Sequence, residues 1–141
     1  MYGQTEPDDA DLIDWPSLAA ERQRLGDQFW RVLGYLHDEG IAAIASIENA
    51  LRVHDAVAMI GPAERLKREA FPLGALRLAE IAETIELEAR DCVESHQDPA
   101  PLIEAVVLLR SVFAQTVEQL RNDSNPLMRK SAVHRPNLLA A

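Results

Sequence analysis

Apolar side chains recur every three or four residues through most of this chain, and this spacing constrains its fold more than any other feature. A repeat of three and four places apolar positions on one face of an α-helix, whereas a half-buried strand alternates with a period of two. The first stripe is Phe29, Val32, Leu33, Leu36, Ala43, Ile44, Ile47 and Leu51. No strand pattern accompanies it, so the sequence predicts an all-α fold.

Three further stripes follow, separated by residues that interrupt helices. The second is Met59, Ala63, Leu66, Ala70 and Leu73. The third is Leu78, Ile81, Ala82, Ile85, Ala89 and Cys92. The fourth is Leu102, Ala105, Val106, Leu109, Val112, Phe113, Thr116 and Leu120. Helices that bury one stripe each and are joined by short connections pack as antiparallel neighbours, so we expect an up-down-up-down four-helix bundle.

A short extra helix precedes the bundle. Asp14 and Pro16 mark its start, because aspartate caps a helix N-terminus and proline fits the first turn. Gly26 marks its end. We expect Trp15 and Trp30 to anchor this helix in the core.

Three residues modify the bundle helices. Asp55 is placed to cap the second of them. Pro62 lies inside that helix and removes one backbone donor, which predicts a bent or late-starting helix. Gly40 weakens the first bundle helix and predicts a bend near residues 38–40.

Composition divides the chain into three parts. Residues 1–14 carry five acids and no base, which predicts a flexible acidic N-terminus. Residues 15–122 form the predicted bundle. Residues 123–141 carry no acid after Asp123, and we expect a flexible C-terminal tail there.

The charge and the cysteine content limit the classes of partner and the cellular location. A net charge of -9 argues against nucleic acid and anionic membranes, because both favour a basic surface. The single cysteine, Cys92, forms no internal disulfide and suits the cytoplasm. No unbroken apolar run approaches the length of a membrane span. We therefore expect a cytoplasmic protein that is monomeric and is not attached to a membrane.

Residues 63–75 carry the most specific motif, Ala-Glu-Arg-Leu-Lys-Arg-Glu-Ala-Phe-Pro-Leu-Gly-Ala. The segment resembles the signature of histidine phosphotransfer (HPt) domains, His-x-Leu-Lys-Gly-(Ser/Glu)-Ala with Gly-Ala shortly afterwards. It departs from that signature at two places. Glu64 stands where the family has its phosphorylated histidine, and Arg68 stands where it has glycine.

The resemblance extends beyond the motif. Residues 27–30 and 50–55 look like the family's second helix and the loop before its active helix. Asp55 precedes Glu64 by the spacing that family members show between a loop aspartate and their histidine. The resemblance therefore implies a bundle of HPt type with the short extra helix at its N-terminus.

In HPt domains an exposed histidine exchanges a phosphoryl group with an aspartate of a receiver domain. The lysine three residues later stabilises the phosphate, and the glycine leaves room for the receiver. Glu64 cannot form a phosphoramidate, and Arg68 fills the space. The resemblance thus implies a pseudo-HPt protein that binds receiver or histidine-kinase domains without carrying phosphate, has no catalytic residue and uses no cofactor.

Helical spacing places Glu64, Lys67, Arg68 and Phe71 on one face. That spacing, together with the matched motif positions, defines the predicted partner-binding residues: Glu64, Lys67, Arg68, Glu69, Phe71 and Gly74. Two alternatives remain open for this face. In the first, the protein is a plain helical interaction module and this face is only a solvated helix surface. In the second, the protein is an active phosphotransfer protein that uses a non-standard acceptor.

Other ionisable residues form no recognisable site in the sequence. The four histidines, His37, His54, His96 and His134, lack a lysine three residues later, and surface positions explain them. Consecutive residues 37–39 point in different directions, so we expect no metal site. A further group of acids predicts a solvated helix face, namely Glu80, Glu83, Glu86 and Glu88.

Overall fold

The structure is a computed structural model that describes residues 12–124. Within this range the chain is all-helical and contains no strand. The α-helices are α2 (Trp15–Leu25), α3 (Phe29–Arg52), α4 (Ala56–Ala70), α5 (Leu76–Ser95) and α6 (Ile103–Ser124). Three short 3-10 turns connect them, η1 (Gly26–Gln28), η2 (Phe71–Leu73) and η3 (Ala100–Leu102). The predicted all-α class is confirmed.

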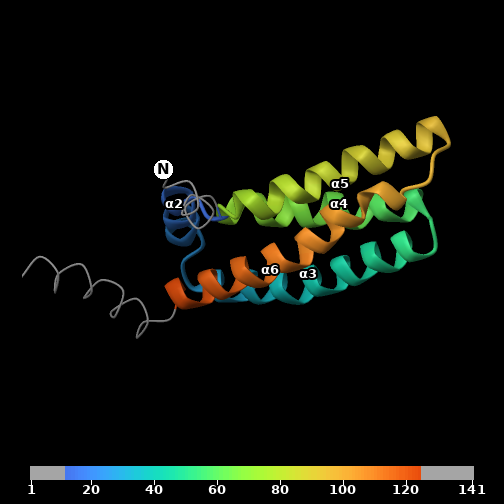
Figure 1. Ribbon diagram of the computed structural model, residues 1–141. Coiled ribbons are helices and arrows are strands. Elements are labelled where there is room, and N and C mark those ends of the chain that lie inside the picture. The colour runs from blue at the N-terminus through green and yellow to red at the C-terminus, as the bar shows by residue number, and fades with distance from the viewer. Residues whose placement is uncertain (1–11, 125–141) are drawn as a thin grey trace, which may run out of the picture.

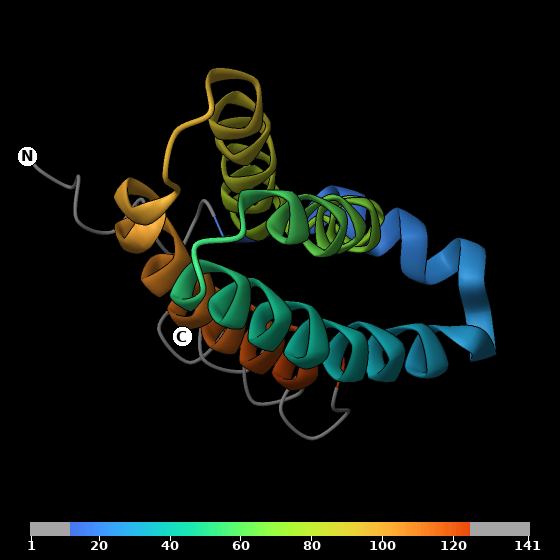
Figure 2. The same ribbon diagram turned by 90° about the vertical axis from the view of Figure 1, so that its right-hand side faces the viewer.

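Helices α3 to α6 run alternately in opposite directions and close a bundle (Figure 1). Helix α4 packs against α3 and α5, and α6 packs against α5 and α3. Figure 2 shows α3 beside α6, with α4 and α5 on the other side of the core. Helix α2 lies at one end, against η2 and the start of α3. The predicted four-helix bundle is therefore present, with the predicted short helix added to it.

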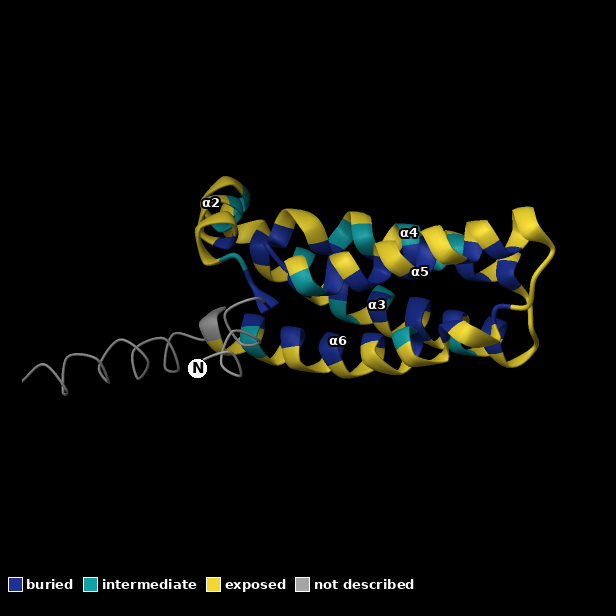
Figure 3. Cartoon of the chain, turned by 45° about the horizontal axis from the view of Figure 1, so that its top comes forward, coloured by how far each residue is buried: buried dark blue, intermediate teal, exposed yellow. Residues whose placement is uncertain are grey.

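The core is aliphatic and continuous along the bundle. Buried residues line the inward face of each helix and exposed residues the outward face (Figure 3). Helices α4 and α5 make the most extensive contact between two helices. Small side chains permit their close approach, namely the fully buried Ala63, Ala70, Ala82 and Ala89. This contact fixes α4, which carries four of the six predicted site residues, against α5.

Gly40 and Pro62 do not interrupt the helices that contain them. Helix α3 is continuous, and Gly40 instead allows α6 to approach, because a Cβ there would collide with the ring of Phe113. Helix α4 begins at Ala56 with Pro62 inside it, so of the two predicted outcomes, a bend or a late start, the late start does not occur. The predicted cap is present, since the backbone N–H of Ala58 donates to Asp55 Oδ1 over 3.1 Å.

The N-terminal segment is tied to the bundle further upstream than predicted. Leu12 and Ile13 are buried, and the backbone N–H of Asp14 donates to the carbonyl of Gly74 over 2.7 Å. Asp14 also caps α2, where its side chain accepts from Ser17. Residues 12–14 of the predicted flexible N-terminus are therefore fixed to the bundle. Its residues 1–11, and residues 125–141 of the predicted tail, lie outside the described residues.

Apolar residues other than the tryptophans hold α2 in place. Leu18 is buried with Ile13 in the core, whereas Trp15 is 41% exposed and Trp30 is 51% exposed. The prediction that both tryptophans are core anchors is wrong. Helical spacing does not separate the two residues of α2, because Trp15 and Leu18 are three positions apart and share one side of the helix. Packing against the bundle covers Leu18 and leaves Trp15 partly exposed.

One stretch of the described residues, Ala100–Asn122, is long and apolar enough to cross a membrane by length and composition. Its most apolar window has a mean hydropathy of 1.5, and 39% of that window is buried inside the bundle. The core helix of a bundle meets the same criterion.

Candidate functional site

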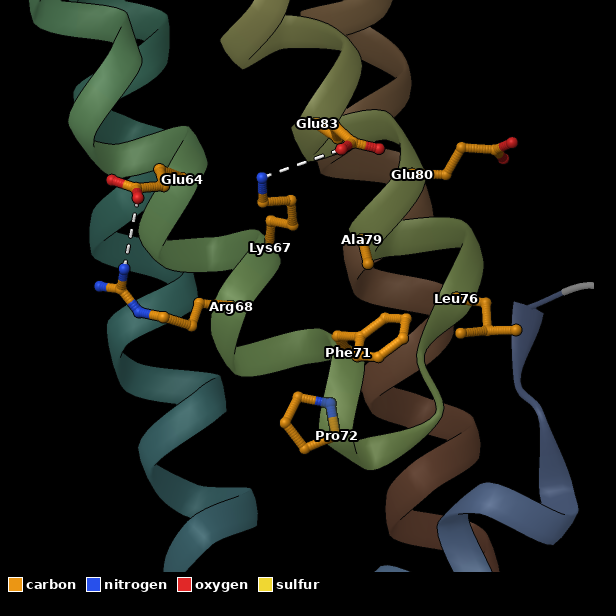
Figure 4. A pocket seen from close by; sticks show the side chains of 9 residues that line it. All are labelled: Glu64, Lys67, Arg68, Phe71, Pro72, Leu76, Ala79, Glu80 and Glu83. Carbon is orange, nitrogen blue, oxygen red and sulfur yellow. Dashed lines mark ion pairs between the residues drawn. The ribbon is translucent and has the colours of Figure 1, made fainter.

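A groove between α4 and α5 brings together four of the six predicted partner-binding residues. Lys67 from α4 and Phe71 from η2 point toward α5, and Glu64 and Arg68 line the groove at its α4 rim (Figure 4). The groove has a volume of about 550 Å³. Its other lining residues, which the motif did not identify, are Pro72, Leu76, Ala79, Glu80 and Glu83.

The end of the groove nearest η2 is apolar. Phe71 begins this turn directly after α4 and is 63% exposed. Pro72 continues the apolar surface, Leu76 and Ala79 supply it from α5, and the Phe71 ring lies between the two helices (Figure 4). An exposed aromatic ring next to further apolar side chains is typical of a protein-binding surface.

Lys67 is held against the opposite helix. Its Nζ donates to Glu86 Oε1 over 2.9 Å and lies 3.9 Å from Glu83 Oε2. Arg90 approaches the other oxygen of Glu86, with Nη2 3.1 Å from Oε2. Glu86 is 5% exposed, so two cations neutralise a carboxylate that is almost fully buried. The prediction that Glu86 belongs to a solvated helix face is therefore wrong.

The protonation equilibria of this cluster follow from its contacts. The hydrogen bond from Lys67 lowers the pKa of Glu86 against the opposing effect of burial, and the bond from Arg90 lowers it further. The same Lys67–Glu86 hydrogen bond raises the pKa of Lys67. Both groups are therefore charged at neutral pH, and the ammonium of Lys67 faces a fixed partner.

Glu64 and Arg68 form a different kind of ion pair on the rim. Arg68 Nη1 lies 3.5 Å from Glu64 Oε2, one helical turn away. The Arg68 side chain is 66% exposed and that of Glu64 is 45% exposed. Exposed pairs of this kind stabilise a fold by about 0–1 kcal/mol. Figure 4 shows Lys67 directed across the groove and Arg68 directed along the outside of α4.

The structure places the other two predicted residues away from the groove. Glu69 does not line the groove, and burial, followed by the charge of Glu39 on α3, raises the pKa of its carboxyl. Gly74 is buried with a φ of 75°, and a Cβ there would lie 2.6 Å from the Asp14 carbonyl oxygen. Gly74 therefore ends η2 and receives the N-terminal segment at a position that does not line the groove.

A second surface lies where α3 meets α6, at the end of the bundle away from α2. His54 has a φ of 62°, and its Nδ1 donates to Asp98 over 2.9 Å. Asp98 also accepts from the backbone N–H of Ala100 over 2.7 Å. The hydrogen bond from His54 and then that from Ala100 lower the pKa of Asp98.

His54 borders a groove of about 500 Å³ whose other lining residues come from α3, η3 and α6: Glu48, Leu51, Arg52, Ala100, Ile103, Val106 and Val107. Ile103 and Val107 are exposed, and Arg110 pairs with Glu48 at the side of this groove. No three His, Cys, Asp or Glu residues within residues 12–124 gather as a possible metal site.

Comparison with known proteins gives no family for the chain. No family model, curated protein or solved structure matches it. The functional assignment therefore depends on the motif at residues 63–75, the bundle and the groove between α4 and α5.

Proposed function

We propose that this protein is a pseudo-HPt signalling protein, which binds receiver or histidine-kinase domains through the groove between α4 and α5 and carries no phosphate itself. In this proposal the bundle is of HPt type, monomeric and cytoplasmic. Its partners are proteins of a two-component phosphorelay, and it uses no cofactor.

One observation carries the proposal. Glu64, the residue at the motif's acceptor position, lies on the rim of a groove that also contains an exposed aromatic ring. A carboxylate there accepts hydrogen bonds and attracts cations, but it has no nitrogen with which to form a phosphoramidate. The groove therefore has the features of a docking surface and lacks the family's nucleophile.

A binding screen tests the proposal directly. The full chain is measured against each isolated receiver domain and each kinase of the source organism, for example by biolayer interferometry. We expect saturable binding to at least one of them. Phe71→Ala should weaken that binding, whereas Leu87→Ala should not, because Leu87 is 52% exposed on α5 and does not line the groove. Absence of binding to every domain would refute the proposal.

A labelling experiment tests the absence of phosphate transfer. The wild-type chain, mixed with a phosphorylated receiver or kinase, should acquire no acid-labile phosphate. Glu64→His with Arg68→Gly restores a nucleophile and space, and should be labelled more than either single variant. Lys67 limits the gain because Glu86 holds it, so adding Glu86→Gln should raise labelling further. A folded triple variant that binds a receiver and still accepts no phosphate would contradict this account of the groove.

A second candidate function is phosphotransfer through His54. The Nδ1 of this residue donates to Asp98, which leaves Nε2 as the unprotonated ring nitrogen in the neutral form, and its side chain is 62% exposed. Acid-labile phosphate that disappears in His54→Gln would establish this function. A chain that binds no signalling domain and accepts no phosphate would instead be the plain helical interaction module.

A further inference from the structure

The two adjacent cations of the motif differ sharply in their surroundings. Lys67 Nζ is 2.9 Å from Glu86, and its side chain is 30% exposed. Arg68 Nη1 is 3.5 Å from Glu64, and its side chain is 66% exposed. A partner that recruited Lys67 would have to leave the buried carboxylate of Glu86 with one cation fewer. Such a loss is costly because desolvated charges need compensation.

Recruiting Arg68 carries no comparable cost. Glu64 is 45% exposed, so water solvates its carboxylate when the guanidinium moves away. The guanidinium has five N–H donors and forms bidentate bonds with a planar carboxylate. It lies on the same helix face as Phe71, whose ring offers an apolar contact next to the charged one. A charged contact beside an aromatic anchor is a common composition of binding hot spots.

We infer that Arg68, paired with a carboxylate of the partner and flanked by Phe71, determines partner choice at this groove, and that Lys67 is a positioning residue that holds α5 against α4. This inference rests on the proposed function, because it concerns the same groove. It assigns the charged contact to the residue that departs from the motif. The lysine that matches the motif becomes part of the groove wall.

The inference also defines the surface that a partner must present. That surface carries an exposed carboxylate opposite Arg68 and an apolar side chain that contacts Phe71, Pro72 and Leu76. A basic group on the partner would meet Glu80 and Glu83 on the α5 side of the groove, where both carboxylates are exposed. Partners with a cation opposite Arg68 are disfavoured by like-charge repulsion.

The test compares four variants of the full chain by their Kd for the receiver or kinase domain that binds most tightly in the screen. Arg68→Ala should weaken binding about tenfold or more, which corresponds to about 1.4 kcal/mol. Arg68→Lys should recover part of this loss. Lys67→Met with Glu86→Gln removes the buried pair and leaves Arg90, which is 49% exposed, to be solvated by water; this variant should bind within about threefold of wild type. Arg65→Ala, which removes an exposed cation of α4 that does not line the groove, should bind like wild type.

The salt dependence separates a charged contact from a change in shape. Wild-type binding should weaken as salt rises from about 50 to about 500 mM, and Arg68→Ala should flatten that dependence. The double variant at positions 67 and 86 should keep the wild-type slope. A double variant that loses binding and salt dependence while Arg68→Ala retains both would overturn the inference and leave the proposed function intact.

The assignment of Lys67 also has a readout that needs no partner. Nitrogen-15 NMR of the lysine ammonium should show a protected Lys67 Nζ signal in the wild type that is lost in Glu86→Gln. A rapidly exchanging Lys67 signal that Glu86→Gln does not alter would overturn the assignment. If no signalling domain binds the wild type, the proposed function fails, and with it the partner contact assigned to Arg68.

Discussion

The inner wall and the outer rim of the groove use the same residue types for opposite purposes. On the inner wall, Lys67 and Arg90 neutralise Glu86, a carboxylate that is almost fully buried. On the rim, Arg68 meets Glu64 where both side chains are largely in water. Burial makes the first set of contacts part of the fold, whereas exposure leaves the second free to exchange. A charged residue is therefore available to a partner only if its present contact can be lost at little cost.

Glu86→Ala should produce the largest loss of stability among the changes that test this comparison. The variant removes a buried side chain and leaves Lys67 and Arg90 without their shared partner. We expect the free energy of unfolding to fall by about 2–3 kcal/mol, less than the upper values for buried pairs because both cations reach solvent. Urea denaturation followed by circular dichroism measures the change. A loss below about 0.5 kcal/mol would show that the inner wall behaves like ordinary surface pairs.

Lys67→Met should have the second largest effect and should be rescued by a second change. The single variant leaves the buried Glu86 with Arg90 alone, so its Tm should fall. Lys67→Met with Glu86→Gln should be more stable than Lys67→Met, since a neutral amide needs no cation. Thermal unfolding of the four proteins in the cycle measures the coupling. Simple additivity of the two changes would contradict the assignment.

The pH dependence of stability should depend on the same cluster. The pKa of Glu86 is lower in the folded protein than in the unfolded chain. Ionised Glu86 therefore stabilises the fold fully at pH values above the ordinary glutamate pKa. This stabilisation is lost as the pH falls through the pKa that Glu86 has in the folded protein. Glu86→Gln should therefore flatten the acid side of the stability profile below about pH 5. The pKa of Lys67 is raised, so its contribution is lost only as the pH rises through its folded value.

Changes on the rim should have the smallest effect on stability. Arg68→Ala and Glu64→Gln each remove one member of an exposed pair one helical turn apart, and each should change the free energy of unfolding by no more than about 0.5 kcal/mol. The same denaturation measurements apply. A loss comparable to that of Glu86→Ala would mean that the rim, too, is a structural contact and would remove the basis for assigning Arg68 to a partner.

The candidate site was predictable only where one helix supplied the geometry. The spacing of Glu64, Lys67, Arg68 and Phe71 placed them on one face, and the structure places all four in one groove. The α5 side of the groove was not identified, because residues of another helix are brought there by packing. The sequence predicts a solvated helix face for Glu80 and Glu83, but no pattern in it indicates that they line the same groove.

The sequence by itself determined the helices, because the period of three and four residues is a property of each segment alone. It also determined local caps such as Asp55 and the helix end at Gly26. Only the tertiary structure decided that Glu86 is buried between two cations, that Gly74 receives the N-terminal segment and that Trp15 stays exposed. These outcomes depend on the rotation and register of each helix against its neighbours. Packing between helices fixes both, and the spacing within a single helix does not encode them.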